Sequence, residues 1–335
     1  MNYKNIKLEK GMYGIPGKSF TDILEELDPT KNYAGTNLES LDAFQRQLKR
    51  FDIKVSGPGS DKVEKFFSST ESIALFPEYV ARAVKMGMEN QNKLSDIVAT
   101  VTKIDSIDYR SVRSTMSDDD LSLKNVNEGA QIPETNISTS SNLVTLRKRG
   151  RMLTASYEAI RFQKLDLFTA VLKQIGAHIA QSQMMDAVNV LLDGDGNENA
   201  IEVTTLSAAP TYADIITLWG KLVPYNLNTI LAGTEAVKAL MQMNEFKDSA
   251  AGMNFHATGK LCTPLGANII HIPSMPAGKI IGLDKNCALE MVQAGEVLTE
   301  YDKLIDRQIE RATISTIAGF SKLFDGASHA LEYTV

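Results

Sequence analysis

The chain has 335 residues, of which 43% are hydrophobic, so it is long enough to bury the cores of about two domains. Its 35 Lys and Arg residues against 41 Asp and Glu residues give a net charge of -6, which argues against a surface devoted to gripping nucleic-acid backbone. The sequence has no apolar run near the ~20 residues of a membrane span, no apolar core of a signal peptide and only two cysteines, Cys262 and Cys287, which argues against membrane-spanning and disulfide-rich secreted proteins.

Residues 11–20, GMYGIPGKSF, end in the Gly-Lys-Ser tail of a phosphate-binding P-loop. Five residues separate Gly11 from Gly17 where the motif needs four, and the preceding residues are too polar for the buried strand from which such a loop starts. We therefore expect a glycine and proline turn here, with Ser19 or Thr21 capping a short helix in TDILEEL, and no nucleotide binding.

The first 60 residues are polar and rich in turns, but the segment LESLDAFQRQLKRF has an apolar stripe at helical spacing. The stripe consists of Leu38, Leu41, Phe44, Leu48 and Phe51. A short arm has no core of its own, so we expect the stripe to be buried either on the rest of the chain or on a neighbouring molecule. After the break SGPGSD, Pro77 suits the first turn of a second helix in FPEYVARAVKMGMEN.

Alternation in DIVATVTKIDSIDYRS predicts a strand, which a long polar segment follows. That segment, residues 111–142, is rich in Ser, Thr, Asn and Asp and contains the acidic run Asp118, Asp119 and Asp120. Loops of this length are usually functional or disordered. The next segment, LVTLRKRGRMLTAS, predicts a strand with a basic cluster that includes Arg147 and Arg149.

The strongest helical pattern runs from Leu165 to Leu192. Its 28 residues would span about 42 Å, longer than most globular helices, and Gly176, Ala177 and Ala180 would let another backbone come close. After DGDGNENA, strand and helix patterns alternate and predict an α/β-like domain over residues 200–295. The C-terminal segment LIDRQIERATISTIAGFSKLF predicts a returning strand.

The motifs of catalysis and metal binding are all incomplete. DGDGNENAIEVT begins like a calcium loop, but Glu198 stands where the loop needs glycine and Thr204 where it needs glutamate. The four histidines lack metal-ligand spacing, the serines lack a nucleophile elbow, and the basic cluster lacks aromatic residues to stack on bases. We therefore expect no enzyme activity, no cofactor and no metal, although the alternating region leaves a soluble α/β enzyme as an open alternative.

The segment EGAQIPETNISTSSNLVTLRKRGRMLTASYEAI, the long helix and its Gly-Asp-Gly end together resemble major capsid proteins of tailed bacteriophages with the Hong Kong ninety-seven fold. In that family a Glu-Gly, Ile-Pro-Glu stretch lies in an extended loop, and a strand with a Ser-x-Glu-like step leads from it to a long spine helix. Here the step is Ser156, Tyr157 and Glu158, and the C-terminal order from PLGANIIHIP to RATISTIAGF is also similar. The resemblance covers about residues 60–325.

The resemblance implies an α+β fold with an N-terminal arm, an extended loop, a spine helix, and peripheral and axial domains. The arm would be residues 1–60, the loop 111–145, the peripheral domain with the spine helix 61–110, 146–199 and 300–335, and the axial domain 200–299. It implies self-assembly through hexamers and pentamers into an icosahedral shell around double-stranded DNA. Our hypothesis for contacts between subunits names Leu41, Phe44, Leu48, Asp118, Asp119, Asp120, Arg147 and Arg149.

The resemblance also implies partners and a location. We expect other copies of the chain, a scaffolding protein and a portal during assembly, and non-specifically packaged DNA, with a decoration protein as an open alternative and no membrane. Assembly would take place in the host cytoplasm, and the protein would reside in the virion.

Because about 60 residues precede the resembling region, we expect the scaffolding protein to be a separate chain. We expect no Lys-Asn cross-link, because no motif marks a partner for Lys124. The alternative function is an encapsulin-type nanocompartment shell, which has the same fold.

Overall fold

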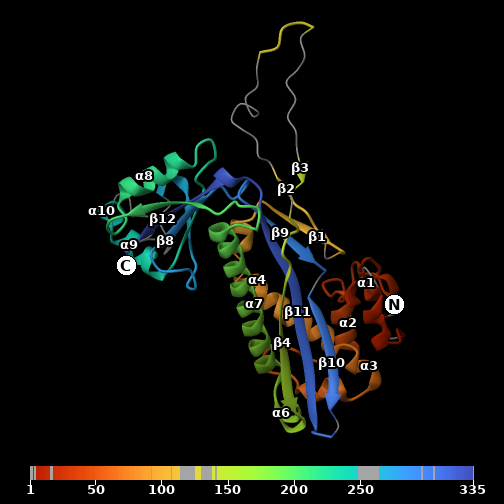
Figure 1. The fold of residues 1–335 in the computed structure, drawn as a ribbon. Helices are drawn as coiled ribbons and strands as arrows, with labels where there is room; N and C mark the ends of the chain where they lie inside the picture. Colours follow the sequence, from red (N-terminus) through yellow and green to blue (C-terminus); the bar gives the residue numbers. More distant parts are fainter. Residues whose placement is uncertain are drawn as a thin grey trace. The chain divides into compact units, whose positions relative to one another are not determined.

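The computed structural model divides the chain into two compact units that each contain helices and strands (Figure 1). The first unit comprises Met1–Gln91, Arg149–Ala180 and Val297–Thr316, and the second comprises Asn92–Lys148, Gln181–Glu296 and Ile317–Val335. The predicted α+β class is confirmed. The residues that the structure describes are 3, 5–15, 18–91, 93–106, 108–113, 125–129, 138–139, 142–247, 264–295, 297–304 and 306–334.

The first unit begins with a series of helices, of which η denotes 3-10 helices. They are η1 (Lys10–Gly14), α1 (Phe20–Leu27), η2 (Thr30–Tyr33), α2 (Ala43–Arg50), η3 (Val63–Phe67), α3 (Thr70–Ile73) and α4 (Phe76–Gln91). Side chains start two of them: Ser19 accepts a hydrogen bond from the Asp22 N–H before α1, and Asp42 accepts one from the Gln45 N–H before α2. The predicted cap at Ser19 is confirmed.

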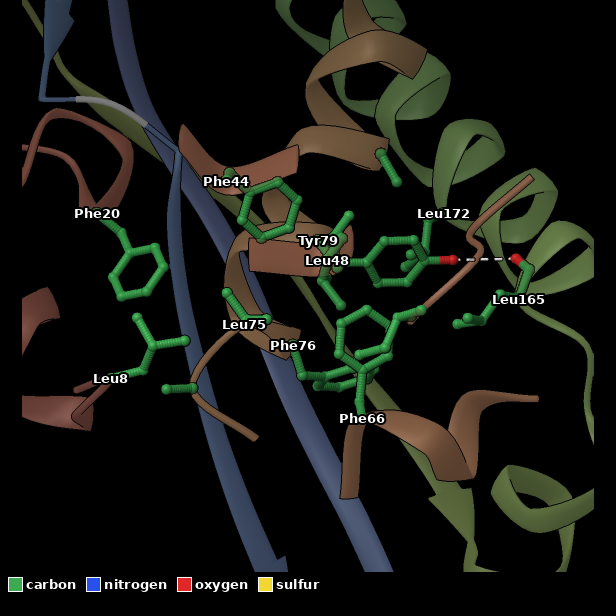
Figure 2. Packing of buried hydrophobic residues seen from close by; sticks show 14 of the residues in the cluster. Leu8, Phe20, Phe44, Leu48, Phe66, Leu75, Phe76, Tyr79, Leu165 and Leu172 are labelled. Atoms are coloured by element: carbon green, nitrogen blue, oxygen red, sulfur yellow. Dashed lines mark hydrogen bonds between the residues drawn. The ribbon is translucent and has the colours of Figure 1, made fainter. Parts of the chain in front are cut away.

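The apolar stripe of the N-terminal region is buried against its own chain. Phe44 and Leu48 belong to one buried cluster with residues of α4 and of the beginning of α7 (Leu165–Asp193) (Figure 2). In this core the Tyr79 hydroxyl donates a hydrogen bond to the Leu165 carbonyl at 3.0 Å, and burial raises the pKa of Tyr79 to about 12. Of the two alternatives that the sequence left open, the stripe is thus buried on the rest of the chain.

A fully buried ion pair holds the N-terminal helices together. Arg46 Nε donates to one oxygen of the Asp28 carboxylate at 3.0 Å, and the Tyr33 hydroxyl donates to the other at 2.6 Å. The Arg46 guanidinium also lies 4.4 Å from the centre of the Tyr33 ring and donates to the Leu41 carbonyl at 2.6 Å. Because each charged group has several partners, these bonds offset the desolvation cost of the pair. The N-terminal region is therefore folded, with a buried polar cluster of its own and an apolar core that it shares with α4 and α7.

Helices α4 and α7 approach each other through glycines. A Cβ atom on Gly176 would lie 2.1 Å from the Val84 carbonyl oxygen, and one on Gly87 would lie 2.1 Å from the Lys173 carbonyl oxygen. Since neither position has room for a side chain, the two backbones touch directly. The close approach predicted at Gly176 is confirmed, and the approaching helix belongs to the same chain.

Three strands complete the first unit. Strand β10 (Leu298–Leu304) pairs antiparallel with the first half of β11 (Ile309–Lys322), and β4 (Arg147–Ser156) pairs with β11 as well. Helix α6 (Tyr157–Phe162) leads from β4 into α7. The 29 residues of α7 confirm the predicted spine helix, and β4 and β11 confirm the strands predicted on either side of it in sequence.

The second unit contains two mixed sheets. In one of them β9 (Leu289–Ala294) pairs parallel with β1 (Thr100–Ile104) and antiparallel with residues 318–322 of β11. The other sheet has the strand order β5, β12, β8, β6, β7. Its strands are β5 (Glu202–Leu206), β6 (Thr229–Ala232), β7 (Asn268–His271), β8 (Lys279–Leu283) and β12 (Ser328–Tyr333).

Helices α8 (Tyr212–Lys221) and α9 (Thr234–Gln242) pack on this second sheet through one buried cluster. The remaining short elements are η4 (Leu94–Asp96), β2 (Val112–Arg113), β3 (Ser138–Thr139), α10 (Asn244–Lys247), η5 (Pro264–Gly266) and η6 (Asp325–Ala327). Strands and helices alternate over residues 200–295 as predicted, but their sheet also contains the C-terminal strand β12. The boundary expected from the sequence, which grouped residues 300–335 with the long helix, differs from the strand pairing because β12 hydrogen-bonds to β5 and β8.

Candidate functional site

The long polar loop begins at a buried carboxylate in the second unit. Glu290 of β9 is 4% exposed and accepts hydrogen bonds from the hydroxyls of Thr102 at 2.5 Å, Tyr109 at 2.8 Å and Ser111. Thr102 belongs to β1, whereas Tyr109 and Ser111 stand just before β2, where the chain enters the loop. Burial, followed by the hydrogen bond to Glu290, raises the pKa of Tyr109. Glu290 therefore ties the entering chain to β9.

The chain returning from the loop is tied to the turn that ends α7. The side-chain amide of Asn142 donates to the Gly196 carbonyl at 2.6 Å, and the Asn142 N–H donates to the Asn197 side chain at 3.2 Å. The Val144 N–H donates to the Tyr109 carbonyl at 2.9 Å, which joins the returning chain to the entering chain. Strands β2 and β3 pair antiparallel between these points. We call residues 109–113, 138–139 and 142–145 the loop base.

The Gly-Asp-Gly turn after α7 is held by hydrogen bonds to β11. The Asp195 carboxylate accepts from the Asn197 side chain at 2.8 Å, the Ser321 hydroxyl at 2.9 Å and the Lys322 N–H at 3.0 Å. The Lys322 ammonium is 2% exposed and donates to the Asn199 carbonyl at 2.7 Å. Burial lowers the pKa of Lys322; burial also opposes the charge on Asp195, but the hydrogen bonds outweigh it and lower the pKa of that carboxyl. The Asp195 carboxylate therefore joins the turn after α7 to β11.

Helix α8 of the second unit also has large apolar side chains on a side that does not pack on its sheet. Ile216 and Trp219 on that side are 46% and 48% exposed, and Val223, just beyond the helix, is 65% exposed. A Cβ atom on Gly220 would have no neighbour within 4 Å. Exposed apolar side chains that gather in one place are typical of surfaces that another molecule covers. We call Ile216, Trp219, Gly220 and Val223 the α8 face.

A second exposed apolar patch lies where α6 leads into α7 in the first unit. Phe162, Leu167 and Val171 are 67%, 59% and 50% exposed. The Lys62 ammonium lies 5.5 Å from the centre of the Phe162 ring. Leu167 and Val171 are four residues apart on α7 and so lie on the same side of this helix. Adjoining exposed apolar side chains are typical of surfaces that other molecules cover.

The contact residues that the sequence named in the N-terminal region have little surface to offer. Phe44 and Leu48 are 3% and 6% exposed because they pack inside the first unit, and Leu41 is half-buried. Their role between subunits stays a prediction, but the buried pair would have to leave its own core to take it up. The acidic run Asp118–Asp120 and the cross-link candidate Lys124 lie outside the described residues.

The two arginines of β4 lie in different surroundings. Arg147 is about half exposed, and its guanidinium lies 2.9 Å from the Asp186 carboxylate of α7 beside a cavity of about 220 Å³. Arg149 is half-buried. Arg147 of the basic cluster is thus paired with an acidic neighbour. The contact of either arginine with another subunit stays a prediction.

Of the residues that hold the loop base, Gly196 belongs to the Gly-Asp-Gly motif, whereas Glu290 belonged to no motif in the sequence. Glu290 gave only a weak signal, as a charged residue between the apolar residues Leu289 and Met291. In the part of the chain that the structure describes, no group of three His, Cys, Asp or Glu side chains is placed to hold a metal ion. Among the same residues, no helix combines the length and apolarity that crossing a membrane requires.

A family model described as phage capsid protein matches residues 139–319, which is more than half of the chain and includes the loop exit, α7, the second sheet except β12, and most of β11. This chain belongs to the phage capsid protein family. The resemblance seen in the sequence is confirmed, and so is the predicted function of a major capsid protein. As a phage capsid protein, it associates with further copies of itself in a shell and resides in the virion. The match favours this function over the encapsulin-type alternative.

Solved structures of particles resemble this capsid protein in fold. The virus-like particle from Pyrococcus furiosus is 12% identical with a TM-score of 0.51, over 76% of this chain and 98% of that chain. The capsid of the native GTA particle is 14% identical with a TM-score of 0.53, over 75% of this chain and 91% of that chain. The capsid of the empty GTA particle is 14% identical with a TM-score of 0.50. No curated protein matches the chain by sequence.

Proposed function

We propose that this capsid protein assembles through hexamers and pentamers into a closed icosahedral shell around double-stranded DNA, and that it has no catalytic activity. The α8 face is the observation that carries the proposal, because it exposes three large apolar side chains that its own unit leaves uncovered. Tryptophan is enriched at the centres of protein interfaces, where its burial contributes most to binding. A neighbouring copy of the chain would cover Trp219 in the shell.

The proposal assigns a role to each region of the chain. Residues 111–145 act as the extended loop that reaches over an adjacent subunit, and residues 200–299 form the axial domain near the symmetry axis of the capsomer. A scaffolding protein and a portal take part during assembly in the host cytoplasm. The net charge of -6 supports a shell that confines DNA without holding it tightly.

Electron microscopy and light scattering of the purified protein, alone and with its scaffolding protein, test the proposal. We expect closed shells, tubes or capsomer rings. Trp219 is the only tryptophan of the chain, so its fluorescence reports on one site. We expect its emission to shift to shorter wavelength on assembly, because the ring would leave water. A monodisperse monomer or dimer under all conditions would refute the function, and shells from virions that lack nucleic acid would return the encapsulin alternative.

Substitution of Trp219 tests whether the α8 face forms the contact between subunits. Trp219→Lys should abolish assembly while leaving the unassembled protein folded, because the side chain is half exposed there. Leu27→Lys is the matched control, since Leu27 of α1 is 51% exposed but stands outside the proposed contact. Assembly of Trp219→Lys at the wild-type yield would show that the α8 face is not the contact.

A further inference from the structure

We propose that Glu290 is a positioning residue that sets the direction in which the extended loop leaves the body of the subunit, and so decides whether subunits close into shells of one size. The inference rests on the proposed function, since it needs the loop to contact an adjacent subunit. It concerns residues of the loop base, which the structure describes on both the entering and the returning chain.

A carboxylate at this place in β9 is costly. The neighbouring residues Leu289, Met291 and Val292 are buried apolar side chains, and Glu290 is itself 4% exposed. Burying a carboxylate away from water costs free energy unless hydrogen bonds replace the lost hydration. The hydrogen bonds that the structure describes for Glu290 all come from neutral hydroxyls. An apolar residue would fill a strand position with less penalty, so the carboxylate is better explained by the groups that it holds.

The two hydroxyls on the loop side of Glu290, those of Tyr109 and Ser111, fix the direction of the chain that enters the loop. Tyr109 and Ser111 are two residues apart, so in an extended chain their side chains point to the same side. Tyr109 donates to Oε1 and Ser111 donates to Oε2 of the same carboxylate. Both hydroxyls donate, so both of their protons point at the Glu290 side chain. One attachment would leave a pivot, whereas two attachments on alternate residues fix the course of the chain into β2.

The returning chain follows the entering chain. The Val144 N–H bonds to the carbonyl of Tyr109, the residue whose hydroxyl Glu290 accepts. Val112 and Arg113 pair with Thr139 and Ser138. A change in the position of Tyr109 would therefore be passed to both strands of the β2–β3 ribbon, and the ribbon would carry the loop to a new direction.

The decisive variant combines Tyr109→Phe with Ser111→Ala, which removes both loop-side hydroxyls and leaves Glu290 in place. Thr102→Val is the control. It removes one hydroxyl from Glu290 and a hydrogen bond of the Tyr109 side chain, but it leaves the hydroxyls of Tyr109 and Ser111 on the carboxylate, and Thr102 is held in β1 by its pairing with β9. Hydrogen exchange of the unassembled subunit should become at least about tenfold faster at the Val144 N–H in the double variant only, because this bond depends on the place of Tyr109. Exchange within β9 should stay at the wild-type rate in both variants.

Electron microscopy of the assembled material gives the second readout. We expect wild-type protein and Thr102→Val to form shells of one diameter, and the double variant to form shells of mixed diameter or open sheets. Faster exchange at Val144 with shells of wild-type diameter would overturn the proposal, because the hydroxyls would then stabilise the loop base without directing assembly. Unchanged exchange would overturn it as well. If wild-type protein forms no shell, the proposed function fails while the exchange result still tests the hold of Glu290 on the loop base.

Two substitutions of Glu290 itself test whether the hydrogen bonds of this residue direct the loop. Glu290→Gln should keep wild-type exchange and wild-type shells, since the amide oxygen still accepts and the amide nitrogen can donate to the Ser111 hydroxyl. Glu290→Ala should behave as the double variant does. Equal behaviour of Gln and Ala in both readouts would show that the hydrogen bonds of residue 290 do not direct the loop.

Discussion

Gly176→Ala should destabilise the subunit, although alanine is the better helix former. The added Cβ would lie 2.1 Å from the Val84 carbonyl oxygen and 2.8 Å from the Met88 nitrogen, so α4 and α7 would have to separate. A Cβ atom in ordinary contact lies ~3.4 Å or more from its neighbours, so the helices would have to separate by about 1 Å or more. The obstructing atoms belong to the backbone, which cannot turn aside as a flexible side chain can.

The expected loss follows from two opposing terms. Forcing an extra methyl into a packed interface typically costs about 1–3 kcal/mol, and a gap of ~1 Å along the seam sacrifices part of the dispersion attraction of buried residues such as Leu172 and Val80. The gain in helix propensity from glycine to alanine is about 1 kcal/mol. We expect a net loss of about 2 kcal/mol in the free energy of unfolding.

Chemical denaturation of the unassembled subunit measures this loss. Gly220→Ala is the matched control, because Gly220 also lies in a helix but has nothing within 4 Å of the new methyl group. It should stabilise the protein by about 0.5–1 kcal/mol. The two variants make the same chemical change and should therefore shift the denaturation midpoint in opposite directions. A Gly176→Ala protein as stable as wild type would refute the direct contact between the two backbones.

Two further substitutions test the buried polar groups. Asp195→Asn should cost about 1–3 kcal/mol, because an amide nitrogen then faces the donors of Ser321 and Lys322. Although burial raises the pKa of Asp195, its hydrogen bonds lower it overall, so its stabilisation is complete above the unfolded-state value of ~3.9 and is lost as the pH falls through the lower folded-state value. Unfolding free energies between about pH 2 and 6 should therefore fall less steeply on acidification in Asp195→Asn than in wild type, and parallel curves would contradict this assignment. Arg46→Met should lower the free energy of unfolding by about 3–5 kcal/mol in thermal or chemical unfolding, since it leaves the Asp28 carboxylate buried without its cation. The double variant Arg46→Met, Asp28→Leu removes both charges, and a loss of the same size in it would argue against an unpaired charge as the cause.

Local patterns of the sequence were sufficient for the regular elements. The 29 residues of α7, the strands β4 and β11, and the cap at Ser19 were all predicted, because side-chain periodicity and capping act over a few neighbouring residues. The order of the motifs was also sufficient for the capsid family. Both kinds of information are written along the chain and need no knowledge of which distant residues meet.

Local patterns did not predict which segments far apart in the sequence are in contact. The stripe around Phe44 predicted a buried face, but only the folded chain shows that α4 and α7 bury it. The resemblance grouped the residues of strand β12 with the peripheral domain, yet β12 pairs with β5 and β8, which lie far from it in sequence. The hydroxyl donors of Glu290 lie 179 to 188 residues away from it in sequence.

The sequence by itself determined what each segment forms and which family the chain resembles, since helix, strand and turn preferences and the order of the motifs are properties of the chain read in one direction. Only the tertiary structure decided which surfaces remain exposed and which buried polar groups find partners. Trp219 is notable because its own unit leaves it about half exposed, and Glu290 because it is buried with hydroxyl donors from the loop base. Burial and hydrogen bonding depend on contacts between residues far apart in sequence, and no local pattern specifies them.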